Sequence, residues 1–307
     1  MADRTERGKP FCKGHIPWNK GLGSLKKKCQ NCSKSIIVQR SLWLQGHGKF
    51  CSKVCQYNYK FKLAGELKLN GDMAELVGII IGDGCINKYS CQNSYRITIS
   101  GNKIEDKPYL DKYVSNLIIR CIGRKPRAYL AHNGAYILHF SYEPLRIFLN
   151  CLGVTSNKTR TVKIPELIKQ DNFLLRRCIR GIADTDFTLI GCSRFGKKNY
   201  YPRITAQFAS ESLVKDLKES LLSFGFTVNI LCNKKRNNHK GNYWITNHIN
   251  LDGPHNLQRW MKKIGFKNSR IITRYLCLKR LCMLPPKTTL PQRIRMLAGE
   301  GVVVNER

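Results

Sequence analysis

Two aspartates end two similar segments of this sequence. Asp83 ends the apolar part of AELVGIIIGDG (74–84), and Asp186 ends LLRRCIRGIADTD (174–186). Carboxylate oxygens are ligands that hard divalent cations such as Mg²⁺ prefer. Two carboxylates held together could bind Mg²⁺, which activates water and stabilises the leaving oxygen of a phosphodiester. Because the macrodipole disfavours a carboxylate at a helix C-terminus, the duplication favours a functional role over an incidental turn residue.

Four cysteines form a second candidate site. Cys29 and Cys32 make one close pair, and Cys51 and Cys55 make another. Two such pairs joined by a loop are typical of a tetrahedral zinc site. Four thiolates leave no open coordination position, so we expect a structural Zn²⁺ that stabilises a small domain. Lysines crowd around these cysteines and indicate contact with phosphates: Lys26, Lys27, Lys28, Lys53, Lys60 and Lys62.

The elements around the two aspartates repeat in the same order. Each aspartate is followed by an Arg-Ile-Thr strand pattern and by a helical pattern closed by glycine. Two strand patterns around a glycine turn come next, and then a second helical pattern closed by glycine. Such self-similarity predicts two copies of one structural unit. We expect an α+β fold in which two helix–strand–strand–helix–strand–strand–helix copies, 70–168 and 169–283, form one pseudo-symmetric domain.

Polar and apolar residues alternate along one strand of each copy. In SYRITIS (94–100) the isoleucines alternate with arginine, threonine and serine, and PRITAQF (202–208) repeats the pattern. This period of two predicts antiparallel sheets with one apolar face and one polar, basic face. Two such sheets form a basic saddle for a duplex, and the expected DNA-contacting residues are Arg96, Thr98, Ser100, Lys125, Arg127, Arg194, Lys197, Lys198, Arg203, Thr205, Lys234, Lys235 and Arg236.

Both aspartate-bearing segments are predicted to be helices that pack against each other. Asp72, with Glu75 three residues later, is typical of a capping box, and Asp171 is a plausible cap of the second helix. Small residues recur along both helices: Ala74 and Gly78 in the first, Gly181 and Ala183 in the second. Glycine costs a helix about 1 kcal/mol relative to alanine, so its use here predicts a very close helix contact. Such a contact would bring the two helix ends, with their aspartates, side by side.

The charge of the chain indicates a polyanionic partner. Its 54 Lys and Arg residues against 20 Asp and Glu give a net charge of +34, spread along the sequence. A folded body with this field favours nucleic acid over a membrane surface. The sequence has no apolar run of about 18 residues, and its N-terminus is too polar for a secretory signal. The 14 cysteines are therefore expected to be reduced, in the cytoplasm, a nucleoid or an organelle matrix, with no secretion and no membrane partner.

LVGIIIGDG (76–84) and IRGIADTDF (179–187) resemble the two motifs of single-chain LAGLIDADG homing endonucleases, and the duplicated pattern covers residues 70–275. The resemblance implies a monomer with two αββαββα halves, whose motif helices form the interface between them. It implies that each final aspartate binds Mg²⁺ and cuts one strand of a long double-stranded DNA site, giving staggered ends. The carbonyls of Gly82 and Thr185 would be further metal ligands, and Gln207 and Lys103 would organise water.

The two ends of the chain fall outside the repeat. GHIPWNKGLG (14–23) lies in an extended basic segment, residues 1–25, with Trp18 and Lys20 as candidate DNA contacts. Together with the cysteine module at 26–62, which is zinc-ribbon-like, this segment resembles small DNA-binding appendages beside such enzymes. Residues 284–307 are rich in proline at their start and are expected to be a poorly ordered extension.

Phe187 departs from the family pattern, because the first motif closes with Gly84. If the backbone at Phe187 is left-handed, a bulky side chain costs about 1–2 kcal/mol, so either the local turn differs or the second half is weakened. Because Asp186 is present, we still expect an active enzyme, and two alternatives to the endonuclease stay open. One is a cleavage-deficient DNA-binding regulator on the same fold, and the other is an intron maturase that binds its own intron RNA. An intein is disfavoured, because no splicing block surrounds the domain.

Overall fold

The computed structural model describes residues 23–89, 94–156, 159–194, 196–237 and 243–300. The chain forms two compact units, which divide between Leu63 and Ala64. Each unit is described by itself. Among the described residues, no helix is long and apolar enough to cross a membrane.

The first unit is built around a short hairpin. Its elements are β1 (Ser24–Lys28), β2 (Ser35–Gln39), α1 (Arg40–Leu44) and α2 (Lys53–Gly65), and the last residues of α2 belong to the second unit. The hairpin strands pair antiparallel, with Lys28 opposite Ser35. Among residues 23–63, the described part of this unit, few hydrophobic side chains are buried, notably Cys29 and Val38. A core of this size is too small to stabilise a domain without a further contribution.

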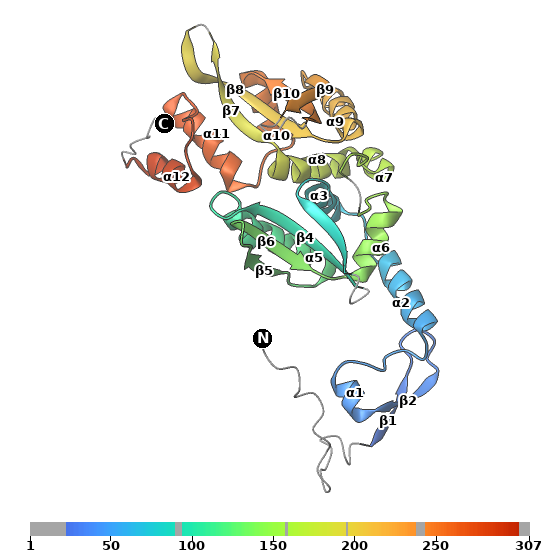
Figure 1. Cartoon of the computed structure of the whole chain (residues 1–307). Coiled ribbons are helices and arrows are strands. Elements are labelled where there is room, and N and C mark those ends of the chain that lie inside the picture. Colours follow the sequence, from blue (N-terminus) through green and yellow to red (C-terminus); the bar gives the residue numbers. More distant parts are fainter. Residues whose placement is uncertain (1–22, 90–93, 157–158, 195, 238–242, 301–307) are drawn as a thin grey trace. The chain divides into compact units, whose positions relative to one another are not determined.

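The second unit contains two halves with the same order of elements (Figure 1). The first half consists of α3 (Gly71–Ile81), β3 (Gly84–Tyr89), β4 (Ser94–Asn102), a helical run α4 (Lys107–Tyr109), η2 (Leu110–Val114) and α5 (Ser115–Ile122), then β5 (Arg127–Leu130), β6 (Ala135–Phe140) and α6 (Glu143–Cys151). The second consists of α7 (Glu166–Lys169), α8 (Asn172–Asp186), β7 (Thr188–Arg194), β8 (Lys197–Phe208), α9 (Glu211–Ser223), β9 (Asn229–Asn237), β10 (Tyr243–Asp252) and α10 (Pro254–Lys263). Apart from the extra helix α7, this is the predicted duplication, and the α+β fold class is confirmed.

Each half has one antiparallel four-stranded sheet. The strand orders are β3-β4-β6-β5 and β7-β8-β10-β9, so the second strand of each half pairs with the first and the fourth. Ile97 and Ile99 of β4 are buried, as are Ile204 and Phe208 of β8. The predicted alternation of apolar and polar residues along these strands is therefore confirmed. Helices α3 and α8 lie side by side between the two sheets (Figure 1).

Within the described residues, two helices follow the duplicated elements: α11 (Ser269–Leu281), which falls inside the expected bounds 169–283 of the second copy, and α12 (Leu290–Ala298). The expectation that residues from 284 onward are poorly ordered was wrong for α12. Its Arg293 is fully buried, and its guanidinium donates to Glu105 Oε2 at 2.5 Å and to Thr273 Oγ1 at 3.0 Å. Proline at the second helical position does not prevent a helix, because the first backbone N–H groups have no intrahelical partner. A buried ion pair then fixes the helix against the first half.

Candidate functional site

The two motif helices approach each other as closely as their backbones allow. A Cβ atom on Gly78 would lie 2.1 Å from the Cys178 carbonyl oxygen, and one on Gly181 would lie 2.2 Å from the Glu75 carbonyl oxygen. Both glycines are therefore required by contact with the partner helix, because real side chains do not fit at these distances. The predicted close packing of the two helices is confirmed.

The start of this interface carries buried charge, and here the predicted capping box was wrong. Asn70 caps α3, and its side chain accepts from the Met73 N–H at 2.9 Å. Glu75 is fully buried and accepts from Arg180 Nη2 at 2.5 Å and from the Tyr113 hydroxyl at 2.7 Å. The partner helix supplies the arginine, so Glu75 serves the interface rather than its own helix. Asp171 does cap α8, because its side chain accepts from the N–H groups of residues 173 and 174.

The ends of the two helices meet beside the aspartates. A Cβ atom on Gly82 would lie 2.1 Å from Asp186 Oδ2 and 2.1 Å from Thr185 Oγ1. Asp83 follows Gly82 directly, and its carbonyl accepts from the Ser100 N–H at 3.3 Å. The glycine thus leaves a space next to the Asp186 carboxylate that any side chain would fill. The Asp186 carboxylate oxygen beside this space is of the ligand type that hard divalent cations prefer.

A pocket of about 280 Å³ lies at this junction and contains three of the predicted site residues. Gly82, Asp186 and Gln207 all line it. Ser156 and Thr159 line it too, and sequence reasoning missed them. They belong to the connection between α6 and α7, which has no periodic pattern, so the sequence carried no signal for them.

Lys103 is not brought into this pocket. Its Nζ lies close to the β5–β6 turn, 4.0 Å from the position of a Cβ atom on Gly134. It follows the last residue of β4, Asn102. The structure therefore associates Gln207, but not Lys103, with the pocket that Asp186 lines.

Thr185 is held by α11, a helix that follows the repeat. Its carbonyl, the predicted metal ligand, accepts from Arg270 Nη2 at 2.9 Å. Its hydroxyl lies 2.7 Å from Asp186 Oδ2 and 2.8 Å from the Ile182 carbonyl oxygen, so these two acceptors share one proton. The metal-ligand prediction for this carbonyl did not anticipate Arg270, because α11 was not predicted.

Asp184 also binds residues at the start of α11. This buried carboxylate accepts from the backbone N–H groups of Lys267 at 2.9 Å and Asn268 at 3.0 Å. Burial raises the pKa of Asp184 to about 7. The residue is therefore a structural anchor of the α10–α11 connection rather than a member of the pocket.

Phe187 adopts an ordinary extended conformation, with φ −81° and ψ 154°. Its ring is fully buried, and the ring centroids of Trp260 and Phe208 lie 5.6 and 6.0 Å away. Gly84 is not left-handed either; a Cβ atom there would lie 2.5 Å from Ile80 Cα. Of the two outcomes expected for Phe187, the structure therefore shows a backbone without the left-handed turn, so the penalty does not arise. Glycine is needed at position 84 because of a close contact with the backbone of Ile80.

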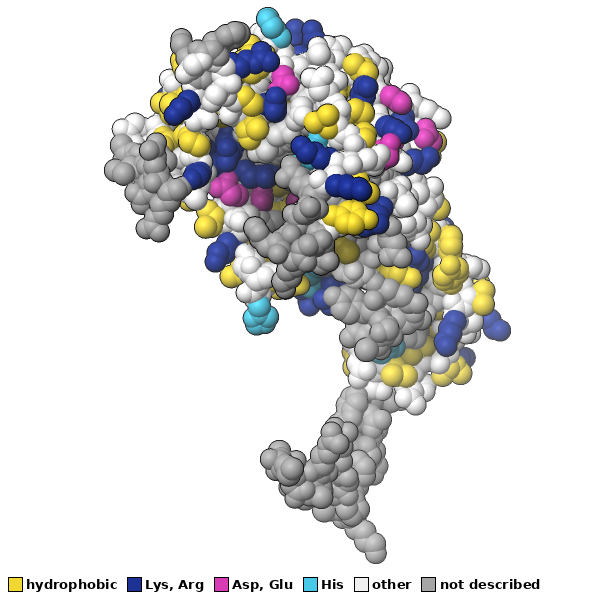
Figure 2. Space-filling model, turned by 45° about the horizontal axis from the view of Figure 1, so that its top comes forward, with side chains coloured by type: hydrophobic (Ala, Val, Ile, Leu, Met, Phe, Trp, Pro, Cys, Tyr) yellow, Lys and Arg dark blue, Asp and Glu magenta, His cyan; other side chains and the backbone are white. Residues whose placement is uncertain are grey.

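The exposed faces of the two sheets differ in how their basic residues are engaged. In the first half Arg96, Lys125 and Arg127 line a pocket of about 450 Å³ together with Arg124 and His139, which sequence reasoning missed. Burial, followed by Arg96 and Arg127, lowers the pKa of His139. Basic side chains are scattered over the face shown in Figure 2.

In the second half several predicted DNA contacts already have partners within the protein. Arg203 forms an ion pair with Asp252, and Thr205 Oγ1 donates to Asn250 Oδ1 at 2.6 Å. Arg194 lies over the Tyr201 ring, 4.1 Å from its centroid. Lys198, Lys234 and Lys235 are exposed, whereas Thr98 and Ser100 of the first half are half-buried. The predictions for Trp18, Lys20 and the side chains of Lys197 and Arg236 lie outside the described residues.

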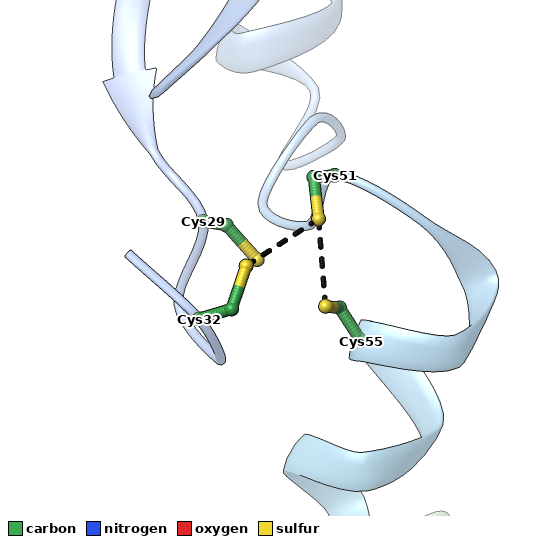
Figure 3. A group of neighbouring side chains, drawn as sticks. All are labelled: Cys29, Cys32, Cys51 and Cys55. Atoms are coloured by element: carbon green, nitrogen blue, oxygen red, sulfur yellow. Dashed lines mark hydrogen bonds between the residues drawn. The ribbon is translucent and has the colours of Figure 1, made fainter. Parts of the chain in front are cut away.

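The four predicted zinc-binding cysteines come together in the first unit, with their sulfur atoms pointing toward one another (Figure 3). All four Sγ atoms lie within 4.8 Å of one another, and Cys51 Sγ is 3.5 Å from that of Cys32 and 3.4 Å from that of Cys55. A tetrahedral zinc site with Zn–S bonds of about 2.3 Å needs S···S edges of about 3.8 Å. Within the cluster the backbone N–H of Cys32 lowers the pKa of Cys29 to about 6, whereas hydrogen bonding with Cys55 raises the pKa of Cys51 to about 12. The cluster is therefore compatible with a structural zinc ion.

No family model matches the chain. A curated protein of Methanocaldococcus jannaschii, the replication factor C small subunit, is 26% identical over 224 residues; these cover 71% of this chain but only 11% of that protein. Among solved structures, mesophilic variants of the homing endonuclease I-DmoI are similar, with a TM-score of 0.43, 18% identity, and coverage of 64% of this chain and 90% of that chain.

Two further solved structures are similar at the same level. The homing endonuclease I-WcaI bound to its DNA recognition sequence gives a TM-score of 0.44 with 16% identity, covering 72% of this chain and 90% of that chain. The N-terminal LAGLIDADG domain of WhiA gives a TM-score of 0.41 with 14% identity, covering 67% and 90%. Similarity of this extent carries no conclusion about activity, which depends on the site itself.

Proposed function

We propose that this chain is a site-specific double-strand DNA endonuclease that depends on Mg²⁺. The observation that carries the proposal is the contact between Gly82 and the Asp186 carboxylate, which brings the end of one motif helix against the end of the other. Two carboxylates at such a junction, below two sheets with basic residues, match a reaction that hydrolyses two phosphodiesters close together. Both halves lie in one chain, so a monomer contains the whole site.

The proposed roles follow from position. Asp83 and Asp186 hold the metal, with the carbonyl of Gly82 as a further ligand. Bound Mg²⁺ supplies Lewis acidity, which lowers the pKa of water and stabilises the leaving oxygen. Gln207 orients the attacking water in the pocket that it shares with Asp186. Each aspartate serves one strand, which gives staggered ends, and the basic residues of both sheets bind the phosphates of a long duplex site.

A randomised duplex library tests the proposal. Purified protein with Mg²⁺ is expected to cut a recurrent long site with a fixed stagger, which sequencing of the cut ends would reveal. The double variant Asp83→Asn/Asp186→Asn should lose cleavage. Asp171→Asn is the matched control, because it removes a carboxylate from the same helix while asparagine caps a helix equally well.

The second candidate is a DNA-binding regulator that does not cut. The hydrogen bond from Arg270 to the Thr185 carbonyl favours it, since this oxygen is a predicted metal ligand. Retention of specific duplexes without cut ends would move the conclusion to this candidate. Specific retention of the surrounding intron RNA instead would identify a maturase.

We also propose that the four cysteines bind one structural Zn²⁺ and that their module contacts DNA. Residues 24–65 contain eight Lys, one Arg and no Asp or Glu, which suits a polyanion. Chelation should release one zinc per chain and make residues 24–63 sensitive to protease while the larger unit stays folded. Cys51→Ser should abolish the release, whereas Cys151→Ser, at an exposed cysteine of α6, should not. Retention of zinc in Cys51→Ser would contradict the assignment.

A further inference from the structure

Arg270, at the start of α11, is attached to the end of the second motif helix. Its Nη2 lies 2.9 Å from the carbonyl oxygen of Thr185, 3.3 Å from that of Asp184 and 3.4 Å from that of Phe187. Two of these carbonyls belong to the last turn of α8, and the third belongs to its C-cap, Phe187. A guanidinium here neutralises the negative end of the helix dipole and satisfies carbonyls that lack intrahelical partners.

The guanidinium is held in place by the first half of the molecule. Arg270 Nε lies 3.1 Å from Asp106 Oδ1, and Asn268 Nδ2 donates to the same oxygen at 2.8 Å. Asn268 Nδ2 also donates to the Asp184 carbonyl at 2.9 Å. Since Arg270 is only about one-fifth exposed, at 21% of its side chain, its position is fixed by these contacts rather than by solvent.

We infer that Arg270 is a positioning residue that restrains divalent-metal binding at the Asp186 half of the site. The inference rests on the proposed function and deepens it. Two effects act together. The guanidinium donates to the Thr185 carbonyl, so this oxygen is less available to a metal. It also places a positive charge at the residue that precedes Asp186, whose carboxylate would bind the metal. The Thr185 hydroxyl, 2.7 Å from Asp186 Oδ2, further engages that carboxylate. The strand served by Asp186 is therefore the one whose cleavage Arg270 slows.

Charge is the decisive part of this effect. At a separation of about 6 Å in a medium as polarisable as water, a single positive charge weakens the binding of a divalent cation about tenfold. The ion pair with Asp106 offsets part of that repulsion. Removal of the Arg270 charge is therefore expected to tighten metal binding at Asp186 three- to tenfold. A purely structural role for Arg270 predicts the opposite sign, because damage to the end of α8 only weakens a metal site.

The test measures Mn²⁺ binding by electron paramagnetic resonance on zinc-loaded protein, in variants that each retain one carboxylate. Asp83→Asn isolates the Asp186 half, and Asp186→Asn isolates the other. Adding Arg270→Gln to Asp83→Asn should tighten Mn²⁺ binding three- to tenfold, and adding it to Asp186→Asn should change little. Arg270→Lys keeps the charge and should leave the affinity near that of Asp83→Asn alone. Lys279→Gln removes a charge from an exposed position of the same helix and serves as the matched control.

Unchanged or weaker Mn²⁺ binding in Asp83→Asn/Arg270→Gln would overturn the inference while leaving the proposed function intact. Thermal unfolding of each variant checks that the comparison is made between folded proteins. If the Asp83→Asn/Asp186→Asn variant binds Mn²⁺ as well as the unsubstituted protein, the carboxylates are not a metal site. That result would overturn the proposed function and this inference together.

Discussion

The two motifs both contain a final aspartate, but the two aspartates lie in different geometries. Helix α3 stops at Ile81, so Asp83 lies two residues beyond it, whereas α8 continues through Asp186. The next position is Gly84 in one half and Phe187 in the other. Gly84 is required because the Ile80 backbone leaves no room for a Cβ atom, while Phe187 fills an aromatic cluster. Equivalent positions in the two repeats thus have different neighbours, and these neighbours determine which residue fits.

The second half also carries connections that come from outside the repeat. Asp184 and Thr185 are bound by residues at the start of α11, and Asp106 of the first half joins the same cluster. The end of α8 is consequently held by residues 267–270, and Asp106 of the first half holds that segment in turn. The following substitutions test this difference between the two halves.

The largest effect is expected for Phe187→Ala. Removing a fully buried ring from the cluster with Trp260 and Phe208 should lower the free energy of unfolding by about 3–5 kcal/mol. Denaturant unfolding measures this loss, and Leu222→Ala at an exposed position of α9 is the control. A cost no larger than that of the control would mean that Phe187 is not the core residue described here.

Asp184 should make stability depend on pH. Its pKa is raised by burial from 3.8 to about 7, so the folded state favours the protonated acid. The stabilisation is fully present below about pH 4 and is lost as pH rises through 7, by up to about 4 kcal/mol. The difference in unfolding free energy between the unsubstituted protein and Asp184→Asn, measured from pH 4 to 8, should follow this curve. A difference that is constant with pH would contradict the prediction.

The glycines of the helix interface test whether the two halves contribute equally to it. Gly78→Ala and Gly181→Ala should each lower the free energy of unfolding by about 1–3 kcal/mol, because the inserted methyl group forces the helices apart. Gly65→Ala, where nothing lies within 4 Å of the added Cβ atom, is the control. If one of the two interface variants were as stable as the control, the close contact between the helices would not depend on both glycines.

The smallest effect concerns the basic faces of the two sheets. Arg127→Gln should weaken duplex binding by about 1 kcal/mol and reduce the slope of log affinity against log salt by about one. Arg203→Gln/Asp252→Asn removes an ion pair without changing the net charge, so it should leave this slope nearly unchanged. Equal slopes for the two variants would show that Arg203 leaves Asp252 to contact DNA.

Local patterns in the sequence predicted most of the fold. The period of two placed Ile97, Ile99 and Ile204 in the core, and the spacing of glycines and strands revealed the duplication. Asp171 as a cap and the four cysteines as a cluster also depended only on local spacing. These features succeed because a strand face, a helix cap or a cysteine pair is determined over a few residues.

The predictions failed where contacts between segments that are distant in sequence determine the structure. Asp72 and Glu75 have the spacing of a capping box, but arginines of the partner helix and of α5 bind them instead. Arg293 makes α12 part of the fold through Glu105, far away in sequence. For the site, Gln207 and Asp186 line the same pocket, whereas the partner of the Thr185 carbonyl was missed because it belongs to an unpredicted helix. No pattern within a motif reports such contacts.

The most direct test of the central claim is to follow the two DNA strands separately. A duplex carrying the selected site, with a different label on each strand, is incubated with Mg²⁺ and with each single variant. We predict that Asp83→Asn leaves one strand intact, that Asp186→Asn leaves the other intact, and that Asp171→Asn cuts both. Loss of the same strand in both variants, or normal cutting of both strands by either, would contradict a site built from one aspartate of each half.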